Sequence, residues 1–281
     1  MSNEFTEIRL ERSGFVAEVV LCRPEKRNAM APRFFREIKQ AFEELDEDDG
    51  VRVAIIRSEG PVFSAGLDLK EAGSILMGDG SGGGSGGAKR SPAVANEAQY
   101  RVIRELQDCF TQVAHCCKPV IAAVQGKCVG GGVDLISACD VRLCTTDASF
   151  SIFEVKVAIV ADVGTLQRIT PIVGKGMARE MAYTARFIPA DRALACGLVN
   201  EVHSDPEALL AAARLMADEI AENSPLAVQG TKLVLGYSDE HTTDEGLEFV
   251  AQWNASRLRS NDLNEAMSAF LEKRPPKFTG D

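Results

Sequence analysis

The sequence contains little of what metal sites are built from. Only three histidines occur in 281 residues, His115, His203 and His241, and their spacing matches no metal-ligand pattern. Eight cysteines are present, but no two of them form a Cys-x-x-Cys pair, and most lie in apolar runs. Such cysteines are typical of small buried hydrophobic side chains in a reducing compartment. We therefore expect no metal site.

Clustered positive charge, targeting segments and membrane spans are also missing. The net charge is −10, which argues against a nucleic-acid surface because phosphate binding needs clustered Lys and Arg. The first residues, Met-Ser-Asn-Glu-Phe-Thr-Glu, lack the composition of a signal or transit peptide, and the last, Lys-Phe-Thr-Gly-Asp, are not a peroxisomal address. No apolar run approaches the ~20 residues that span a bilayer. These absences predict a cytoplasmic protein with no membrane or nucleic-acid partner.

Apolar periodicity predicts an α/β core over residues 1–203 and a helical region over 204–281. The predicted strands are 5–11, 15–22, 51–56, 120–124, 141–144 and 150–153. The predicted helices of the core are 32–46, 96–117, 131–139, one after Gly164, and 174–185. Those of the second region are 205–222, 225–236, 242–259 and 261–273. The second region has too little core of its own, so we expect it to pack on the main domain or on neighbouring subunits.

One low-complexity segment, rich in glycine and serine, spans residues 78–87. Gly78, Gly80 and Gly83 formally match the dinucleotide pattern Gly-x-Gly-x-x-Gly. However, no strand leads directly into the segment, and Ala-Lys-Arg-Ser-Pro follows it in place of a helix. A flexible surface loop is the better interpretation.

Three acidic residues behind a glycine run carry the strongest chemical signal. Asp134 follows Gly130–Gly132, and Glu154 and Asp162 come 20 and 28 residues later, each in a mostly apolar stretch. Burying an isolated carboxylate is costly, so acids in such places usually perform proton chemistry or cap a helix. Taken singly, Asp134 could complement the dipole of its own helix, Asp162 could be an N-cap, and Glu154 could be a solvated residue at a strand end.

Two glycine turns could supply hydrogen bonds to a negative oxygen. In Phe-Ser-Ala-Gly-Leu-Asp-Leu, residues 63–69, a turn leads into a helix and leaves the Leu67 amide free. In Val-Gly-Gly-Gly-Val-Asp, residues 129–134, a strand turns into a helix and exposes the Gly131 amide in the same way. Two such amides that converge would form an oxyanion hole, whereas two that do not are ordinary turns.

Taken together, these motifs resemble those of the enoyl-CoA hydratase/isomerase (crotonase) superfamily over nearly the whole chain. Besides the two glycine turns, four segments carry the resemblance: Arg-Pro-Glu-Lys-Arg-Asn-Ala-Met at 23–30, Lys-Pro-Val-Ile-Ala-Ala-Val-Gln-Gly at 118–126, Asp-Ala-Ser-Phe-Ser at 147–151 and Gly-Thr-Leu-Gln-Arg at 164–168. Ala-Asp-Arg-Ala-Leu-Ala-Cys-Gly-Leu-Val at 190–199 completes the set. Their order and spacing, more than any one segment, make the resemblance specific.

The resemblance implies a fold, a substrate class and an assembly. The fold would be a crotonase-type spiral of repeated ββα units, with a C-terminal helical region that builds homotrimers or dimers of trimers. The substrate would be an acyl-CoA thioester, its carbonyl oxygen bound by the amides of Leu67 and Gly131, and no separate cofactor is expected. The residues that would border the CoA and acyl pocket are Asn28, Ala29, Ala65, Gly66, Asp68 and Gly130.

The acids indicate the reaction. Hydratases of this superfamily carry glutamates at the positions of Asp134 and Glu154, whereas this chain has a shorter acid at the first position and a third acid, Asp162, where hydratases usually have glycine. This triplet resembles the Δ3,5-Δ2,4-dienoyl-CoA isomerase branch, which moves a proton from C2 to C6 in fatty acid β-oxidation. Glu154 and Asp162 would be the acid–base pair and Asp134 a supporting residue. By analogy with hydratases Glu154 would face C2, but the reverse order is equally open.

Four other functions compete with this one. A 2-enoyl-CoA hydratase or a Δ3-Δ2-enoyl-CoA isomerase would use the same scaffold, and Asp162 is the residue that argues against them. Some crotonase-like proteins bind RNA, but the helix at 32–46 ends in acidic residues where a lysine-rich face would be needed. A non-catalytic assembly protein would leave the acids in apolar stretches unexplained.

Overall fold

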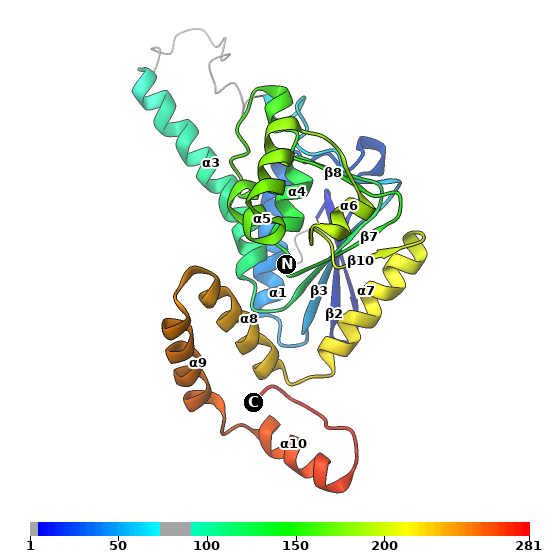
Figure 1. Ribbon diagram of the computed structural model, residues 1–281, viewed down its shortest axis with the longest axis vertical. Coiled ribbons are helices and arrows are strands. Elements are labelled where there is room, and N and C mark those ends of the chain that lie inside the picture. Colours follow the sequence, from blue (N-terminus) through cyan, green and yellow to red (C-terminus); the bar gives the residue numbers. More distant parts are fainter. Residues whose placement is uncertain (1–4, 74–90) are drawn as a thin grey trace.

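The computed structural model describes residues 5–73 and 91–281, and the predicted loop at 78–87 lies outside these ranges. Within them the strands form two sheets, one of six strands in the order β1-β2-β3-β5-β7-β10 and one of four in the order β4-β6-β8-β9 (Figure 1). The strands of the larger sheet are β1 (Ile8–Ser13), β2 (Val16–Leu21), β3 (Val53–Ser58), β5 (Val120–Val124), β7 (Val141–Thr145) and β10 (Glu201–His203). Those of the smaller sheet are β4 (Val62–Ser64), β6 (Lys127–Val129), β8 (Ser149–Ser151) and β9 (Ile188–Pro189).

The larger sheet is the structural core, and helices cover both of its faces. The predicted hairpin is confirmed, because β1 and β2 pair antiparallel, while β2, β3, β5, β7 and β10 run parallel to one another. Side chains alternate along β3, so that Ala54 and Ile56 join one apolar cluster and Val53 and Ile55 the other. Burial on both faces explains why these strands read as continuous apolar runs.

Helix α1 packs on one face of the larger sheet and helix α7 on the other. Five large apolar side chains of α1 (Pro32–Glu47) enter the core, namely Phe34, Phe35, Ile38, Phe42 and Leu45. α7 (Pro206–Ala221) places Leu209 and three alanines against the second face. The remaining helices of the main body are α3 (Pro92–His115), α4 (Gly131–Ser137), α5 (Thr165–Thr184) and α6 (Ala190–Ala195). α5 covers both of the helices predicted after Gly164. The boundary between them is at Gly174, which has a non-helical φ of 77°.

The smaller sheet shows the repeat that defines the fold. Three times, a strand of the larger sheet is followed within a few residues by a short strand of the smaller one: β3 by β4, β5 by β6 and β7 by β8. The short strands pair in parallel, β4 with β6 and β6 with β8. A helix then follows in each unit, namely α3, α4 and α5. The predicted α/β spiral of ββα units is therefore confirmed, and it brings the ends of β4, β6 and β8 to one edge.

Three further helices, α8 (Pro225–Glu240), α9 (Thr243–Arg257) and α10 (Asn261–Glu272), form an arm that extends away from the sheets (Figure 1). Lys232 of α8 joins the arm to the body, because its Nζ lies 2.7 Å from Asp140 Oδ2 and donates to the Lys118 carbonyl at 3.0 Å. α7, the first helix of the region predicted at 204–281, covers the main sheet, and α8–α10 form the arm. The division of the chain at residue 203 stays a prediction. No helix in the described ranges is long and apolar enough to cross a membrane.

Candidate active site

The two predicted glycine turns lie side by side at the edge formed by β4 and β6. The chain leaves β4 through Ala65 and Gly66, and it leaves β6 through Gly130. Gly66 has a φ of 81°, and a Cβ there would lie 2.8 Å from the Val129 carbonyl oxygen and 3.5 Å from the Gly131 nitrogen. Only glycine combines this backbone conformation with so close an approach. The two turns therefore touch through their backbones.

The amides of Leu67 and Gly131 lie close together. Met30 pairs with the first turn on both sides of Leu67, since its amide donates to the Gly66 carbonyl at 2.8 Å and its carbonyl accepts from the Asp68 amide at 3.0 Å. The Leu67 amide between them has no acceptor within the described residues, and neither has the amide of Gly131, the first residue of α4. A Cβ added at Gly131 would lie 3.9 Å from the Leu67 nitrogen. Two free amides in this arrangement can bind one oxyanion.

The predicted pocket residues around these turns differ in what they can contact. Ala65 is exposed, and Ala29 and Leu67 are half-buried. Asn28 is buried, and its side chain is already used, because its amide donates to the Glu59 and Val62 carbonyls, both at 2.9 Å. This side chain holds the turn against β4.

Asp68 has a similar structural task. Its Oδ1 accepts from the backbone amides of Lys70 and Glu71, at 3.1 and 3.2 Å. The carboxylate thereby satisfies amides at the end of the first glycine turn, as an N-terminal capping residue does. The contribution of Asn28 and Asp68 to a substrate pocket is thus to fix the backbone around Leu67.

Glu154 lies beside the second glycine turn. It is the first residue of a 3-10 helix, η3 (Glu154–Val157), which follows β8, and its Oε1 is 3.0 Å from the position of a Cβ at Gly130. Its Oε2 is buried without a hydrogen-bond partner in the described residues. Burial, together with the charges of Asp134 and Asp162, raises the pKa of Glu154 to about 7. The carboxyl can therefore change its protonation state near neutral pH, as a proton-transfer group must.

Asp134 is fully buried on α4 and reaches the next unit of the spiral. Its Oδ1 accepts a hydrogen bond of 2.7 Å from the Thr165 backbone amide, and its Oδ2 has no partner in the described residues. Burial raises the pKa of Asp134 to about 6, although the hydrogen bonds from Thr165 and the charge of Arg168 act in the opposite direction. In the described residues only one of the two Asp134 carboxyl oxygens thus has a hydrogen-bond donor. The charge of Asp134 also contributes to the raised pKa of Glu154.

Asp162 lies in the segment between η3 and α5, half-buried. Burial raises its pKa, and its charge raises the pKa of both Asp134 and Glu154, so the three carboxyl groups are close enough to interact. Asp162 is not the N-cap of α5, because the N-cap position is Gly164 and no side chain of that residue can cap the helix. Glu154 thus lies beside the second glycine turn, and the charges of both Asp134 and Asp162 act on its pKa.

Sequence reasoning missed a cation at this site. Arg168 of α5 folds back over the glycine before the helix, donating to the Val163 carbonyl at 3.3 Å and to Thr111 Oγ1 of α3 at 3.1 Å. Gly164 has a φ of 119°, and any side chain there would overlap the Arg168 guanidinium. In the sequence Arg168 appeared only as the last residue of the Gly-Thr-Leu-Gln-Arg motif. Its partners, Thr111 on α3 and Asp134 on α4, come near it only when these helices pack against α5.

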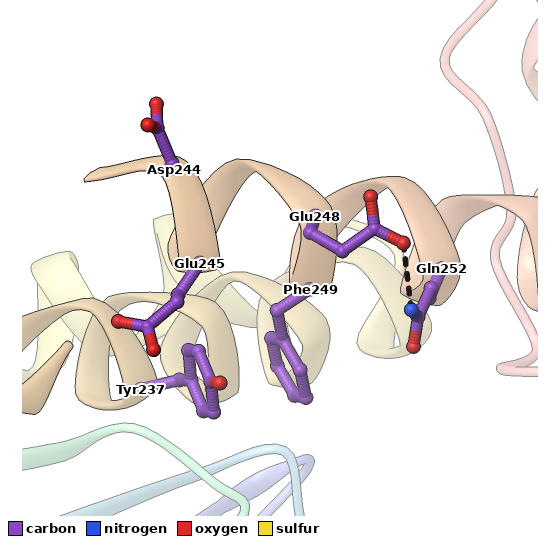
Figure 2. A pocket seen from close by; sticks show the side chains of 6 residues that line it. All are labelled: Tyr237, Asp244, Glu245, Glu248, Phe249 and Gln252. Atoms are coloured by element: carbon purple, nitrogen blue, oxygen red, sulfur yellow. Dashed lines mark hydrogen bonds between the residues drawn. The ribbon is translucent and has the colours of Figure 1, made fainter. Parts of the chain in front are cut away.

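A hollow between α8 and α9 is separate from this site (Figure 2). Tyr237 and Phe249 stack there with ring centroids 4.2 Å apart, and Gln252 donates to Glu248 at 2.8 Å. The lining includes the carboxylates of Asp244, Glu245 and Glu248. Such a rim would repel the phosphates of CoA, so the hollow is a poor place for a thioester of CoA.

Comparison with known proteins places these features in a family. A family model described as "Enoyl-CoA hydratase/isomerase" matches residues 11–281. The mitochondrial Δ3,5-Δ2,4-dienoyl-CoA isomerase of Dictyostelium discoideum is 46% identical over 98% of this chain and 92% of its own length. The peroxisomal enzyme of the same name from Arabidopsis thaliana is 44% identical over 96% of this chain and 95% of its own. A crystal structure of enoyl-CoA hydratase from Bacillus anthracis superposes with a TM-score of 0.86 at 28% identity, covering 98% of this chain and all of the other.

One expectation from the sequence is wrong. We expected a cytoplasmic protein, but the dienoyl-CoA isomerases that resemble this chain are named as mitochondrial or peroxisomal. The expectation rested on the composition of the first and last residues. Cellular address is read from short segments by receptors, independently of the residues that build the fold and the site.

Proposed function

The chain belongs to the enoyl-CoA hydratase/isomerase family, and we propose that it acts as a Δ3,5-Δ2,4-dienoyl-CoA isomerase in fatty acid β-oxidation. The substrate is an acyl-CoA thioester in which each of two double bonds moves one carbon toward C1, from positions 3 and 5 to positions 2 and 4. The prediction of this activity from the sequence is confirmed by relatives of that name, 44% and 46% identical over nearly the whole chain.

The observation that carries the proposal is the position of a third acid. Glu154 and Asp134 stand where hydratases of the family carry two acids, but Asp162 adds a half-buried carboxyl on the segment before α5. Moving a proton from C2 to C6 requires two carboxyl groups set apart, because one short side chain cannot reach both carbons. Hydration at a single double bond does not need this third group.

The free amides of Leu67 and Gly131 supply the electrostatic part of the reaction. They donate to the thioester carbonyl oxygen, which gains negative charge when a proton leaves C2. Each such donor typically contributes about 10²–10³ in rate, because it is already oriented before the charge develops. The N-terminal end of α4, which begins at Gly131, adds its dipole to the same oxygen.

Proton transfer then follows the positions of the two outer acids. Glu154 lies against Gly130, next to the amide that binds the carbonyl oxygen, so it is the acid nearest C2. As a carboxylate it takes the C2 proton, and the electron pair spreads over the oxygen, C2, C4 and C6. Asp162, protonated, delivers a proton to C6, and the double bonds settle at C2 and C4. Proton exchange between the two carboxyls and water restores the starting state.

Asp134 supports this pair and does not itself exchange a proton with substrate. Its carboxylate is anchored to the Thr165 amide, and its charge raises the pKa of Glu154. A base with a pKa near the working pH combines adequate ionised fraction with adequate basicity. The reaction is a proton relocation within one substrate, so it requires no cofactor other than the CoA that the substrate already carries.

The arm of α8–α10 is the proposed oligomerisation region. Large apolar side chains are exposed along α10, among them Met267, Phe270 and Leu271, of which Phe270 is 79% exposed. Apolar residues gathered in this way usually mark a contact surface. A homotrimer or dimer of trimers would cover them. Sedimentation equilibrium should return three or six times the chain mass of 30.3 kDa, whereas a monomer at micromolar concentration would contradict the proposed assembly.

Incubation with two substrates in parallel tests the activity. With 3,5-dienoyl-CoA the purified protein should form 2,4-dienoyl-CoA, which is detected by the ultraviolet absorbance of a diene conjugated with the thioester. With 2-enoyl-CoA it should add little or no water. Rapid hydration of the enoyl substrate without diene isomerisation would instead assign the chain to the hydratases.

A further inference from the structure

The segment that carries Asp162 has almost no backbone support of its own. Residues 160–163 lie between η3 and α5, outside regular structure, and no hydrogen bond between backbone groups holds them within the described residues. A catalytic group must nevertheless be held within a fraction of an ångström of its working position. Something other than secondary structure must therefore fix Asp162.

Side chains of α3 provide the missing support. Gln107 Nε2 donates to the Asp162 carbonyl oxygen at 2.6 Å, and Arg104 Nη1 donates to Gln107 Oε1 at 2.7 Å. The second bond orients the Gln107 amide so that its NH₂ group points at the carbonyl. One helical turn further along the same face of α3 stands Thr111, four residues after Gln107.

Thr111 holds the next peptide through a cation. Its Oγ1 accepts from Arg168 Nη2 at 3.1 Å, while Arg168 Nη1 donates to the Val163 carbonyl at 3.3 Å. Two consecutive carbonyls, those of Asp162 and Val163, are thus fixed from one face of α3. The arrangement leaves the Asp162 carboxyl free of hydrogen bonds to other side chains in the described part of the chain.

We propose that Gln107 is a positioning residue for Asp162, and that the face of α3 formed by Gln107 and Thr111 sets the place from which Asp162 protonates C6. The inference rests on the proposed isomerase function. Gln107 binds the backbone of Asp162 and not its carboxyl group, so its loss should leave the oxyanion hole, Glu154 and CoA binding intact. What is lost is the fixed backbone under Asp162.

Two substitutions test this, with a matched control. Gln107→Leu keeps the approximate volume but removes the donor, so kcat for 3,5-dienoyl-CoA should fall by about 10- to 100-fold while KM stays within about twofold. Exchange of the C2 proton with D₂O, which needs Glu154 and the amides alone, should continue near the wild-type rate. Gln112→Leu changes the same residue type on α3, where the side chain makes no hydrogen bond in the described residues, and should leave kcat unchanged.

Gln107→Glu adds a readout that a loss of stability could not mimic. The introduced carboxyl can donate to the Asp162 carbonyl only when it is protonated, so its kcat relative to wild type should rise as pH falls. This variant keeps the side-chain length, and it carries the test if the leucine variant does not fold. A pH-independent ratio for it, or a kcat for Gln107→Leu within twofold of the Gln112→Leu control, would overturn the inference alone. Failure of the wild-type protein to convert 3,5-dienoyl-CoA would overturn the proposed function, and this inference with it.

Discussion

The carboxylate of Asp134 accepts a hydrogen bond of 2.7 Å from the backbone amide of Thr165, and so caps a helix other than its own. Asp134 belongs to α4 and Thr165 begins α5. The bond links the helix that presents the Gly131 amide to the helix that follows Asp162. Negative charge at the N-terminal end of α5 is favourable, which offsets part of the cost of burying the carboxylate. Asp134 is therefore both a cap and a member of the acid cluster.

Replacing Asp134 should stabilise the protein at high pH. Its folded-state pKa of about 6 lies above the ordinary value of 3.8, so the folded state binds the proton more tightly than the unfolded state. Stability from this group is fully present below the unfolded pKa and is lost as pH rises through about 6. Asp134→Asn keeps an acceptor for Thr165 without the buried charge. It should raise the free energy of unfolding at about pH 8 by ~1–3 kcal/mol, with no gain near pH 4.

Urea unfolding at the two pH values measures this effect. The exposed Asp218 of α7 provides the control, because Asp218→Asn removes a charge of the same sign outside the site. A variant Asp134→Asn that loses stability at high pH would show that the carboxylate is more stabilising through Thr165 and Arg168 than it is costly to bury.

The rate should depend on pH through Glu154. Since its pKa is about 7, kcat/KM for 3,5-dienoyl-CoA should rise with pH through about that value as the Glu154 carboxylate forms, and it should fall at higher pH, where Asp162 loses the proton that it delivers to C6. The charge of Asp134 is one cause of the raised pKa, so Asp134→Asn should move this limb to lower pH. Initial rates across the pH range, at substrate concentrations well below KM, measure the midpoint. An unchanged midpoint in Asp134→Asn would rule out the electrostatic coupling between the two acids.

Two glycines of the site should respond differently to alanine. At Gly131 the nearest atom to a new Cβ is Met30 Sδ at 2.9 Å, the far end of a flexible side chain, but the methyl group would also enter the space 3.9 Å from the Leu67 nitrogen. Gly131→Ala should therefore fold and lose about 10²–10³ in kcat, as expected for a disturbed oxyanion hole.

Gly66→Ala should instead reduce stability. Its φ is 81°, and the new Cβ would meet the rigid Val129 carbonyl at 2.8 Å, so the free energy of unfolding should fall by ~1–3 kcal/mol or more. Thermal unfolding and kcat measured on both variants separate the two effects. Equal losses of stability would contradict the different roles of the two turns.

Much of the fold was predictable because its long elements carry their own pattern. The helices with a strongly apolar face, such as α1 and α7, and the apolar strand β5 lie within a few residues of their predicted bounds. The strands β4, β6, β9 and β10 were not predicted. Each has two or three residues, too few to show an alternating pattern, and they form only because neighbouring units of the spiral supply partners.

The site shows the same limit. The residue types and spacing of Glu154, Asp162 and the two glycine turns were informative by themselves, and the structure brings these residues together. The roles of Gln107 and Arg168 were not visible in the sequence. Gln107 is 55 residues from its partner Asp162 in the sequence, and Arg168 is 57 residues from its partner Thr111. Only the packing of α3 against the segment before α5 reveals these two hydrogen bonds. The chemistry resides in local motifs, whereas its positioning depends on tertiary contacts.

The central claim is that Glu154 and Asp162 divide the proton transfer between C2 and C6. Its most direct test follows 3,5-dienoyl-CoA in D₂O by NMR with wild type, Asp162→Asn and Glu154→Gln. Asp162→Asn should exchange the C2 proton but lose isomerisation by about 10²–10⁴, the usual contribution of a general acid, with binding of a saturated acyl-CoA unchanged. Glu154→Gln should lose both exchange and isomerisation. Isomerisation by Asp162→Asn within about tenfold of wild type would contradict the claim.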